Sequence, residues 1–278
     1  MQYTEKSTIF YVENLSVGYK GKDGKEKLIL RDVNFTEKDV VREGYSSTGQ
    51  KIAFIGRSGR GKSTLFKALT GLLVPSSGQI LVSSCSEESP NSAKKVSDGD
   101  IGFVDQKYTL FRHKTISQIL NYALRKSKLS KIERAAMIKQ YLEDWGLWEE
   151  KDKYSCELSG GQRQRTAIIE QMLSSKHFMI FDEPASGLDI GNIAKMKQSF
   201  QKILDANEYN TIIFSTHDIH LAVELADSIY IIGHPEGVCE YSTIVKHYDL
   251  KKMGLAWQDF GTEHYALVDE IKEVLLKS

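Results

Sequence analysis

The stretch GRSGRGKST, residues 56–64, constrains the fold more than any other part of the chain. It matches G-x-x-x-x-G-K-[ST], a loop whose backbone N–H groups cradle phosphates. This mechanism needs a buried strand before the loop and a helix after it. KIAFI at 51–55 is predicted to be a buried strand, and a helix is expected from about Lys62 to Thr70, with Gly71 just beyond its end. A chance glycine-rich turn is the alternative, and this context disfavours it.

Residues of this loop have separate expected tasks. Gly59 and Gly61 let the backbone turn its N–H groups onto phosphates. Lys62 can reach the β- and γ-phosphates, and the Ser63 hydroxyl can bind Mg²⁺. The loop therefore predicts a nucleoside triphosphate as ligand. The residues expected to contact it here are Gly56, Arg57, Ser58, Gly59, Arg60, Gly61, Lys62, Ser63 and Thr64.

The stretch FMIFDE, residues 178–183, narrows the chemistry. Its four apolar residues predict a core strand, which places Asp182 at the carboxyl edge of the sheet, where ligands bind. Asp182 can then hold Mg²⁺ through water, and Glu183 can polarise an attacking water. A solvated strand exit is the alternative, but the phosphate loop in the same chain favours the functional interpretation.

The order of segments indicates an α/β fold. Strands at 101–104, 178–181, 211–216 and 228–233, several of them uniformly apolar, alternate with helical patterns, which is typical of a parallel sheet covered on both faces. The last of them, SIYIIG, is expected to close the sheet. The predicted class is a P-loop NTPase (RecA-like) core with an N-terminal antiparallel β subdomain and an inserted α-helical subdomain.

Domain limits follow from these patterns. Residues 1–106 and 166–234 are expected to form the nucleotide-binding core with its β subdomain, 107–165 the helical subdomain, and 235–278 a tail with a terminal helix. Within the insertion, Ser130 and Glu133 predict a capping box and Gly146 a helix end. Residues 36–50 are expected to be a hairpin tip, and 85–100 a polar loop. The terminal helix, 264–277, is expected to dock on the body through an apolar stripe.

Charge and composition exclude some functions. Lys plus Arg and Asp plus Glu both number 37, so no field of one sign draws the chain to nucleic acid, which is not expected as a partner. No apolar run approaches the ~18–20 residues of a membrane span, and the N-terminal residues do not resemble a signal peptide. Cys85, Cys156 and Cys239 are widely spaced and are expected to be reduced thiols of a cytoplasmic protein.

A second phosphate-binding turn is suggested by YSCELSGGQRQRTAIIEQM, residues 154–172. A polar Ser-Gly-Gly turn opens what is predicted to be a helix starting near Gln162. Free N–H groups and the positive end of a helix dipole attract anions. The chain thus carries two such turns about a hundred residues apart.

Taken together, these motifs resemble those of the ATP-binding subunits of ABC transporters, over about residues 10–240. They occur in that family's order: GRSGRGKST, Gln106 in VDQ, LSGGQ at 158–162, FMIFDE, SGLD at 186–189, and His217 in STHD. Six motifs in order are far more specific than one.

The resemblance implies roles for individual residues. Gln106 would sense Mg²⁺ and the attacking water, Glu183 would be the general base, and His217 would bond the γ-phosphate. Such positioning carries much of the catalysis in phosphoryl transfer. Tyr19 matches the aromatic residue that stacks on adenine, with an ordinary strand aromatic as the alternative. The implied metal site is Ser63, Gln106 and Asp182.

The resemblance also explains two turns in one chain. In a head-to-tail homodimer, or a pair with a paralogous subunit, LSGGQ of one subunit would cap the γ-phosphate held by the other. The implied contacts are Ser159, Gly160, Gly161, Gln162 and Asp189. ATP binding would close this dimer and hydrolysis would reopen it.

Among relatives, the sequence looks most like bacterial importer subunits of the nitrate, sulfonate and taurine branch. That branch often has a Pro-Trp pair after the glutamine, whereas this chain reads KYTLFRHKT, with Arg112 and His113, in the segment expected to face the membrane partner. Expected partners are transmembrane permease subunits and a solute-binding protein, at the cytoplasmic face of the cell membrane. Alternatives are an exporter or lipid-transport ATPase, a non-transport ABC ATPase, or a degenerate scaffold.

Overall fold

A computed structural model of the chain describes residues 3–21, 24–42, 49–83, 93–97, 99–175, 177–207 and 209–278. The strands are β1 (Tyr3–Lys20), β2 (Glu26–Arg42), β3 (Gln50–Ile55), β4 (Ser77–Ser83), β5 (Ala93–Lys95), β6 (Ile101–Val104), β7 (Phe178–Phe181), β8 (Thr211–Thr216), β9 (Ser228–Gly233) and β10 (Thr243–Asp249). The α-helices are α1 (Lys62–Leu69), α2 (Ile116–Ala123), α3 (Lys131–Asp144), α4 (Gly160–Ser174), α5 (Ile190–Ala206), α6 (Ile219–Leu225) and α7 (Thr262–Lys277). Three short 3-10 helices are η1 (Leu124–Lys126), η2 (Trp148–Glu150) and η3 (Ser155–Glu157).

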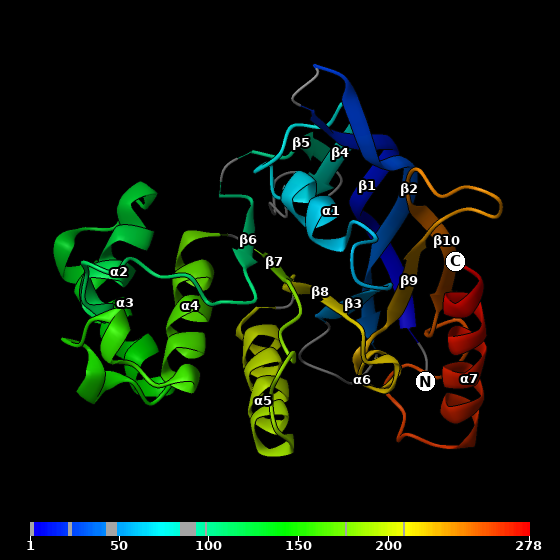
Figure 1. The fold of residues 1–278 in the computed structure, drawn as a ribbon. Coiled ribbons are helices and arrows are strands. Elements are labelled where there is room, and N and C mark those ends of the chain that lie inside the picture. Colours follow the sequence, from blue (N-terminus) through cyan, green and yellow to red (C-terminus); the bar gives the residue numbers. More distant parts are fainter. Residues whose placement is uncertain are drawn as a thin grey trace.

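A six-stranded sheet, ordered β10-β9-β3-β8-β7-β6, forms the centre of the molecule (Figure 1). Its pairs are parallel except for β10, which runs antiparallel to β9. The parallel sheet was therefore predicted correctly, but SIYIIG does not close it, because β10 adds an edge strand. The parallel register brings the ends of β3, β6, β7 and β8 to one edge, where polar segments follow each strand.

A second sheet, ordered β2-β1-β4-β5, is antiparallel. Two expectations are wrong here. Residues 36–42 are not a hairpin tip: β2 continues to Arg42, which pairs with Tyr3 of β1. Residues 93–95 of the expected polar loop form β5, which pairs with β4. Residues 43–48 and 84–92 lie outside the described residues.

Alternate residues of the central strands enter two separate cores, because successive side chains point to opposite faces. Ile52 and Phe54 of β3 pack with α1 and the antiparallel sheet. Ala53 and Ile55 pack on the other face, with residues of α4, α5, α6 and α7. All four side chains are fully buried, so the strand before the phosphate loop is fixed from both sides.

The helices α2, α3 and α4 gather at one end of the molecule, away from β1, β2 and α7 (Figure 1). The predicted capping box of α3 is confirmed: Glu133 N donates to Ser130 Oγ at 3.3 Å, and Ser130 N donates to Glu133 Oε2 at 2.7 Å. The helix ends before Gly146, whose φ is 62°. α4 continues without a break across residue 165, where the domain limit was placed.

The terminal helix α7 docks as its apolar stripe predicts. Leu267, Val268 and Ile271 are buried, and α7 packs against α6. Since α6 begins immediately after Asp218, this packing supports the segment that carries His217.

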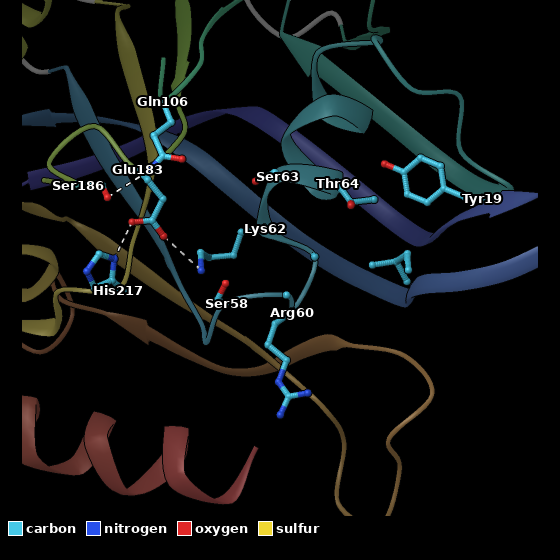
Figure 2. A pocket seen from close by; sticks show the side chains of 13 residues that line it. Tyr19, Ser58, Arg60, Lys62, Ser63, Thr64, Gln106, Glu183, Ser186 and His217 are labelled. Atoms are coloured by element: carbon cyan, nitrogen blue, oxygen red, sulfur yellow. Dashed lines mark hydrogen bonds and ion pairs between the residues drawn. The ribbon is translucent and has the colours of Figure 1, made fainter. Parts of the chain in front are cut away.

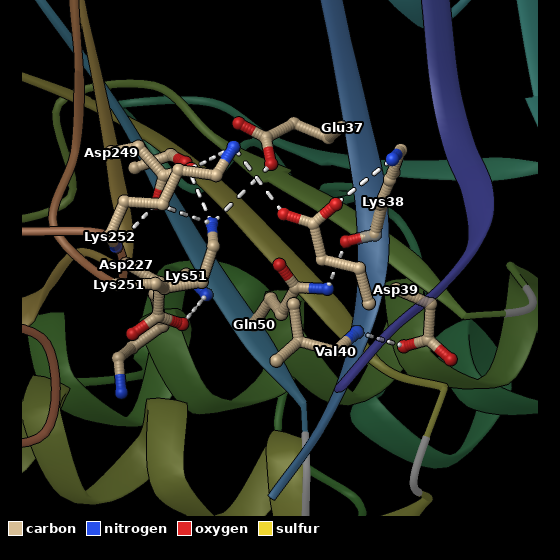
Figure 3. A network of polar contacts seen from close by, with 12 residues as sticks. Glu37, Lys38, Asp39, Val40, Gln50, Lys51, Asp227, Asp249, Lys251 and Lys252 are labelled. Carbon is tan, nitrogen blue, oxygen red and sulfur yellow. Dashed lines mark hydrogen bonds and ion pairs between the residues drawn. The ribbon is translucent and has the colours of Figure 1, made fainter. Parts of the chain in front are cut away.

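A buried polar network joins β2 to β9 and the end of β10, at the amino end of the central sheet (Figure 3). The Tyr230 hydroxyl donates to Glu37 Oε1 at 2.7 Å, and the Lys251 ammonium lies 3.7 Å from Glu37 Oε2 and donates to Ser228 Oγ at 3.0 Å. Burial raises the pKa of the Glu37 carboxyl, while Lys251 and Tyr230 act to lower it. This network ties the late part of the chain to the β1–β2 hairpin.

In the part of the chain that the structure describes, no helix is both long and apolar enough to cross a membrane. Cys156 and Cys239 are free and exposed thiols. Cys85 lies outside the described residues.

Candidate nucleotide-binding site

A cavity of about 660 Å³ opens at the carboxyl edge of the central sheet (Figure 2). It brings together the phosphate loop, the ends of β6, β7 and β8, and the β1–β2 hairpin. The lining residues are Tyr19, Ile29, Ser58, Gly59, Arg60, Gly61, Lys62, Ser63, Thr64, Gln106, Glu183, Ser186 and His217.

The phosphate loop has the backbone that a phosphate cradle needs. Gly61 is the N-cap of α1 with φ 94°, and a Cβ there would come within 2.9 Å of Leu30 Cδ2, so only glycine fits. No side chain caps α1. Among the described residues, no hydrogen-bond acceptor is assigned to the N–H groups of Gly59, Gly61, Lys62 or Ser63. These unmet donors and the helix dipole favour an anion.

Lys62 is held at the base of the loop and is only 7% exposed. Its ammonium donates to the Gly56 carbonyl at 2.6 Å and to the Arg57 carbonyl at 3.4 Å. Its Nζ also lies 3.3 Å from Glu183 Oε1 (Figure 2). The cation thus sits between the loop and the carboxylate that follows β7.

Glu183 is oriented on both sides of its carboxylate. Oε1 pairs with Lys62, and Oε2 lies 2.9 Å from Nδ1 of His217 (Figure 2). The backbone N–H of Glu183 donates to Ser215 Oγ at 2.9 Å, and its φ of 51° is in the left-handed region. Such a conformation costs a non-glycine residue about 1 kcal/mol or more, and it aims the carboxylate into the cavity.

The residues expected to bind Mg²⁺ are Ser63, Gln106 and Asp182. Ser63 and Gln106 line the cavity, whereas Asp182 does not; its Oδ1 accepts a hydrogen bond from Ser215 Oγ at 2.7 Å. One carboxylate, a hydroxyl and an amide oxygen suit Mg²⁺, which usually binds through few protein ligands with water and phosphate oxygens completing its shell. The residues present therefore fit this ion.

Gln106 lies where two segments of the chain meet. Its Nε2 donates to Ser186 Oγ at 3.1 Å, and the Tyr108 hydroxyl donates to the Pro184 carbonyl at 3.1 Å. These bonds connect the segment leading into the helical part to the segment after β7. A ligand that moved Gln106 would therefore displace both of these segments.

Tyr19 lines the opposite end of the cavity from Glu183 and is 45% exposed (Figure 2). Ile29 of β2 lines the cavity too. An exposed aromatic ring beside an aliphatic side chain offers a flat apolar surface for a nucleotide base. The interpretation of Tyr19 as a base-stacking residue stays a prediction.

The Ser-Gly-Gly turn lies in a different cavity, of about 580 Å³, that shares no lining residue with the first. α4 begins at Gly160, earlier than the start near Gln162 that the sequence suggested, because Ser159 is its N-cap in a capping box with Gln162. Ser159 Oγ accepts from Gln162 N at 3.3 Å, and Gln162 Oε1 accepts from Ser159 N at 2.9 Å. Within one subunit the two turns do not form one site.

Some predicted contacts lie outside both cavities. Gly56 and Arg57 contribute carbonyls to Lys62 but do not line the cavity. Arg60 lines it, yet its Nη2 donates to the Ser278 carbonyl at 3.2 Å. Asp189 caps α5, accepting from Asn192 N at 2.8 Å, and lines neither cavity. A nucleotide contact of Asp189 stays a prediction.

Two supporting residues were missed by the sequence interpretation. Ser215 holds both Asp182 and the backbone of Glu183, and Ser186 holds Gln106. The signal for Ser215 is a small hydroxyl near the carboxyl end of the buried strand TIIFST, where a buried polar side chain needs a partner.

The carboxyl of Glu170, on α4, is expected to make the stability of the helical part depend on pH. Burial raises the pKa of its carboxyl to about 7 from an ordinary 4.5, against an opposing effect of Arg125. The folded protein then binds this proton more tightly than the unfolded chain. The resulting stabilisation is complete below pH 4.5 and is lost as the pH rises through about 7.

Glu170→Gln is therefore expected to raise the free energy of unfolding at pH 8 by up to about 3 kcal/mol and to change it little at about pH 4, where the carboxyl is protonated in both the folded and the unfolded chain. Urea unfolding at both pH values measures this. Glu149→Gln, at an exposed site, is the matched control and should behave alike at both. An equal gain from Glu170→Gln at both pH values would contradict the assignment.

The fold and the site first define a class. A phosphate loop between a parallel strand and a helix, with a buried lysine in the loop and an aspartate at the same sheet edge, is the arrangement of a P-loop nucleotide-binding protein. The sequence model of the family described as ABC transporter matches residues 44–186. The chain belongs to this family, as the motifs predicted.

Individual relatives agree. The sulfate/thiosulfate import ATP-binding protein CysA of Synechococcus elongatus is 36% identical over 187 residues, covering 67% of this chain and 53% of that protein. A probable protein of the same name from Chlorella vulgaris is 35% identical, covering 66% and 76%. The solved structure of cbiO1 from Clostridium perfringens, described as part of the ABC transporter complex cbiONQ, has a TM-score of 0.66 at 26% identity and covers 90% of this chain and 92% of its own.

These matches confirm the P-loop NTPase fold. The chain spans about half the length of the first curated relatives that it matches. Those relatives are named for sulfate and thiosulfate import, so the nitrate, sulfonate and taurine branch stays a prediction.

Proposed function

We infer that the chain is the ATP-hydrolysing subunit of an ABC transporter and acts as a head-to-tail dimer. The observation that carries this inference is the separation of the two phosphate-binding turns. Lys62, Glu183 and His217 converge on one cavity, while Ser159 and its glycines line another with no residue in common. A second subunit is the simplest source of the missing half of each site.

ATP fits the first cavity from end to end. The adenine lies on Tyr19 beside Ile29, and the phosphates lie on the unmet N–H groups of the loop and the ammonium of Lys62. Ser63, Asp182 and Gln106 would hold Mg²⁺, which would offset the negative charge of the phosphates. The role of the protein is then mainly positioning and electrostatic stabilisation.

Before nucleotide binds, Lys62 is paired with Glu183. Phosphates compete with Glu183 for the lysine, so nucleotide binding releases Oε1 of the carboxylate. Glu183 then accepts a proton from the water that attacks the γ-phosphorus, while the bond from that phosphorus to the bridging oxygen breaks and ADP leaves. His217 keeps Oε2 in place and can donate to the γ-phosphate, while Ser215 fixes the backbone of Glu183.

The second turn completes the site of the partner. Ser159 and the N–H groups of Gly160 and Gly161 contact the partner's γ-phosphate, supported by the dipole of α4, a helix of 15 residues. Gln162 follows Gly161 directly, and Asp189 is the N-cap of the next helix, α5; in this proposal both bear on the same nucleotide. ATP binding closes the dimer, and hydrolysis reopens it.

Transport requires a membrane path from other subunits. In this proposal, separate permease subunits form the path, and the segment after Gln106 with the helices α2 to α4 (the domain proposed for 107–165) transmits the motion from the nucleotide core. The direction proposed is import, supported by the names of the relatives. The subunit would then lie at the cytoplasmic face of the membrane, with a solute-binding protein on the other side.

Purified protein tests this proposal directly. It is expected to release phosphate from ATP only with Mg²⁺, and to form dimers when ATP is bound and hydrolysis is blocked. Lys62→Ala, which removes the loop cation, is expected to lose both by about tenfold or more because a charge-assisted bond to phosphate is lost. ATP hydrolysis by the Lys62→Ala protein at the rate of the unaltered protein would contradict the assignment.

A further inference from the structure

The cavity beside the Ser-Gly-Gly turn extends well beyond that turn. It lies between α4 and α5, which run next to each other in Figure 1, with Trp145 as a further wall. Its volume of about 580 Å³ is close to that of the nucleotide cavity. Contact of Ser159 and Gly160 with a phosphate of a partner subunit would leave the surface between the two helices unexplained.

Two polar side chains of α4 enter this cavity with unmet hydrogen-bonding capacity. Gln164 is 8% exposed, and within the described residues its amide makes no hydrogen bond. Arg165 has no ion pair in the described part of the chain, and its Nε is buried without a partner. A buried donor left without an acceptor is destabilising, so the buried Nε of Arg165, next to the Gln164 amide that has no partner among the described residues, favours a ligand.

The charge around these side chains is positive. Lys195 and Lys202 of α5 line the same cavity, and no carboxylate is among the described residues that line it. Two acids that contact lining residues of this cavity are held by them: Glu150 accepts from Gln162, and Asp189 accepts from Asn192. Lys202 donates to the Asp144 carbonyl at 2.8 Å, whereas the side chain of Lys195 has no assigned partner among the described residues.

We propose that this cavity is a second oxyanion site, in which Gln164, Arg165 and Lys195 bind a phosphate group. Gln164 and Arg165 follow Gly160 and Gly161 by four residues, so they lie one helical turn, about 5 Å, further along the same face of α4. The site is thus distinct from the Ser-Gly-Gly contact. It belongs to a single subunit, and it does not require the dimer of the proposed function.

The experiment uses the full chain with Lys62→Ala, which disables the phosphate loop. Trp148→Phe and Trp257→Phe leave Trp145, a wall of the cavity, as the only tryptophan. Orthophosphate is titrated at constant ionic strength against chloride, with Trp145 emission and equilibrium dialysis of labelled phosphate as independent readouts. We expect saturable binding of about one phosphate per subunit.

Matched variants locate that binding. Arg165→Gln is expected to weaken it about tenfold, since a charge-assisted bond is lost, and Lys195→Gln several-fold. Lys197→Gln, on the same helix but paired with Glu224 and outside the cavity, should leave it unchanged. Because Lys195 is exposed, its variant decides the question even if Arg165→Gln fails to fold.

Tripolyphosphate and Mg-ATP serve as further arms to identify the source of the phosphate group. Binding of orthophosphate shows that a free anion suffices. Binding of only the longer ligands, weakened by Lys195→Gln, assigns the site to the phosphate chain of a nucleotide. Dialysis that detects no ligand in any arm, or equal affinity in the Lys195→Gln and Lys197→Gln proteins, would overturn the proposal.

Discussion

Glu183→Gln is expected to reduce steady ATP hydrolysis by at least about a hundredfold, the usual contribution of a general base, while ATP still binds. The substitution removes the proton acceptor and its ion pair with Lys62 but keeps the side-chain length and one oxygen within reach of His217. Phosphate release measures turnover, and retention of labelled ATP measures binding. The lysine, freed from its partner, remains available to the phosphates.

Its control is Glu236→Gln, which makes the same chemical change at an exposed loop site and should leave turnover intact. Full turnover in Glu183→Gln would show that another group accepts the proton. Loss of ATP binding together with hydrolysis would instead show that Glu183 supports the site's structure.

Ser159→Arg is expected to abolish ATP-driven dimerisation and hydrolysis while a monomer still binds nucleotide. Ser159 is exposed and lines the cavity of the second turn, so an arginine there obstructs the approach of the partner without entering the core. Sedimentation analysis with ATP, in a Glu183→Gln background, measures dimerisation. Nucleotide binding to the monomer is measured in the same samples.

The substitution also removes the N-cap of α4, a loss of about 1 kcal/mol. Ser130→Arg is the matched control, because Ser130 caps α3 in the same type of capping box with Glu133 and lies outside the cavity. It should show the same loss of stability with normal dimerisation. A strictly monomeric protein that hydrolyses ATP at the full rate would refute the shared site.

Features encoded by a short stretch were predictable. The phosphate loop, the capping box of α3 and the strand that presents Asp182 each depend on residue types at fixed spacing within a few positions. The grouping of Gln106, Glu183 and His217 in one site was implied by the family resemblance, and it has a physical reason, because parallel strands end at one edge of a sheet. The structure does bring these three residues to a single cavity.

Features that depend on pairing between distant segments were not predictable. β10 and the extension of β2 exist because β9 and β1 offer partner strands, which the polar sequences of these segments do not show. Glu37 is charged in the sequence but 4% exposed in the fold, where Tyr230 and Lys251, about two hundred residues later, satisfy it. No local sequence pattern predicts such a distant partner.

The left-handed backbone at Glu183 also bears on how this protein can change over evolutionary time. Glycine and asparagine adopt that conformation more readily than glutamate, so replacements that destroy the proposed base also relieve the backbone. Replacements of Glu183 that abolish hydrolysis are therefore expected to increase the stability of the fold, as in other trade-offs between activity and stability. We expect inactive descendants to arise easily, and an intact glutamate to persist only where selection for turnover continues.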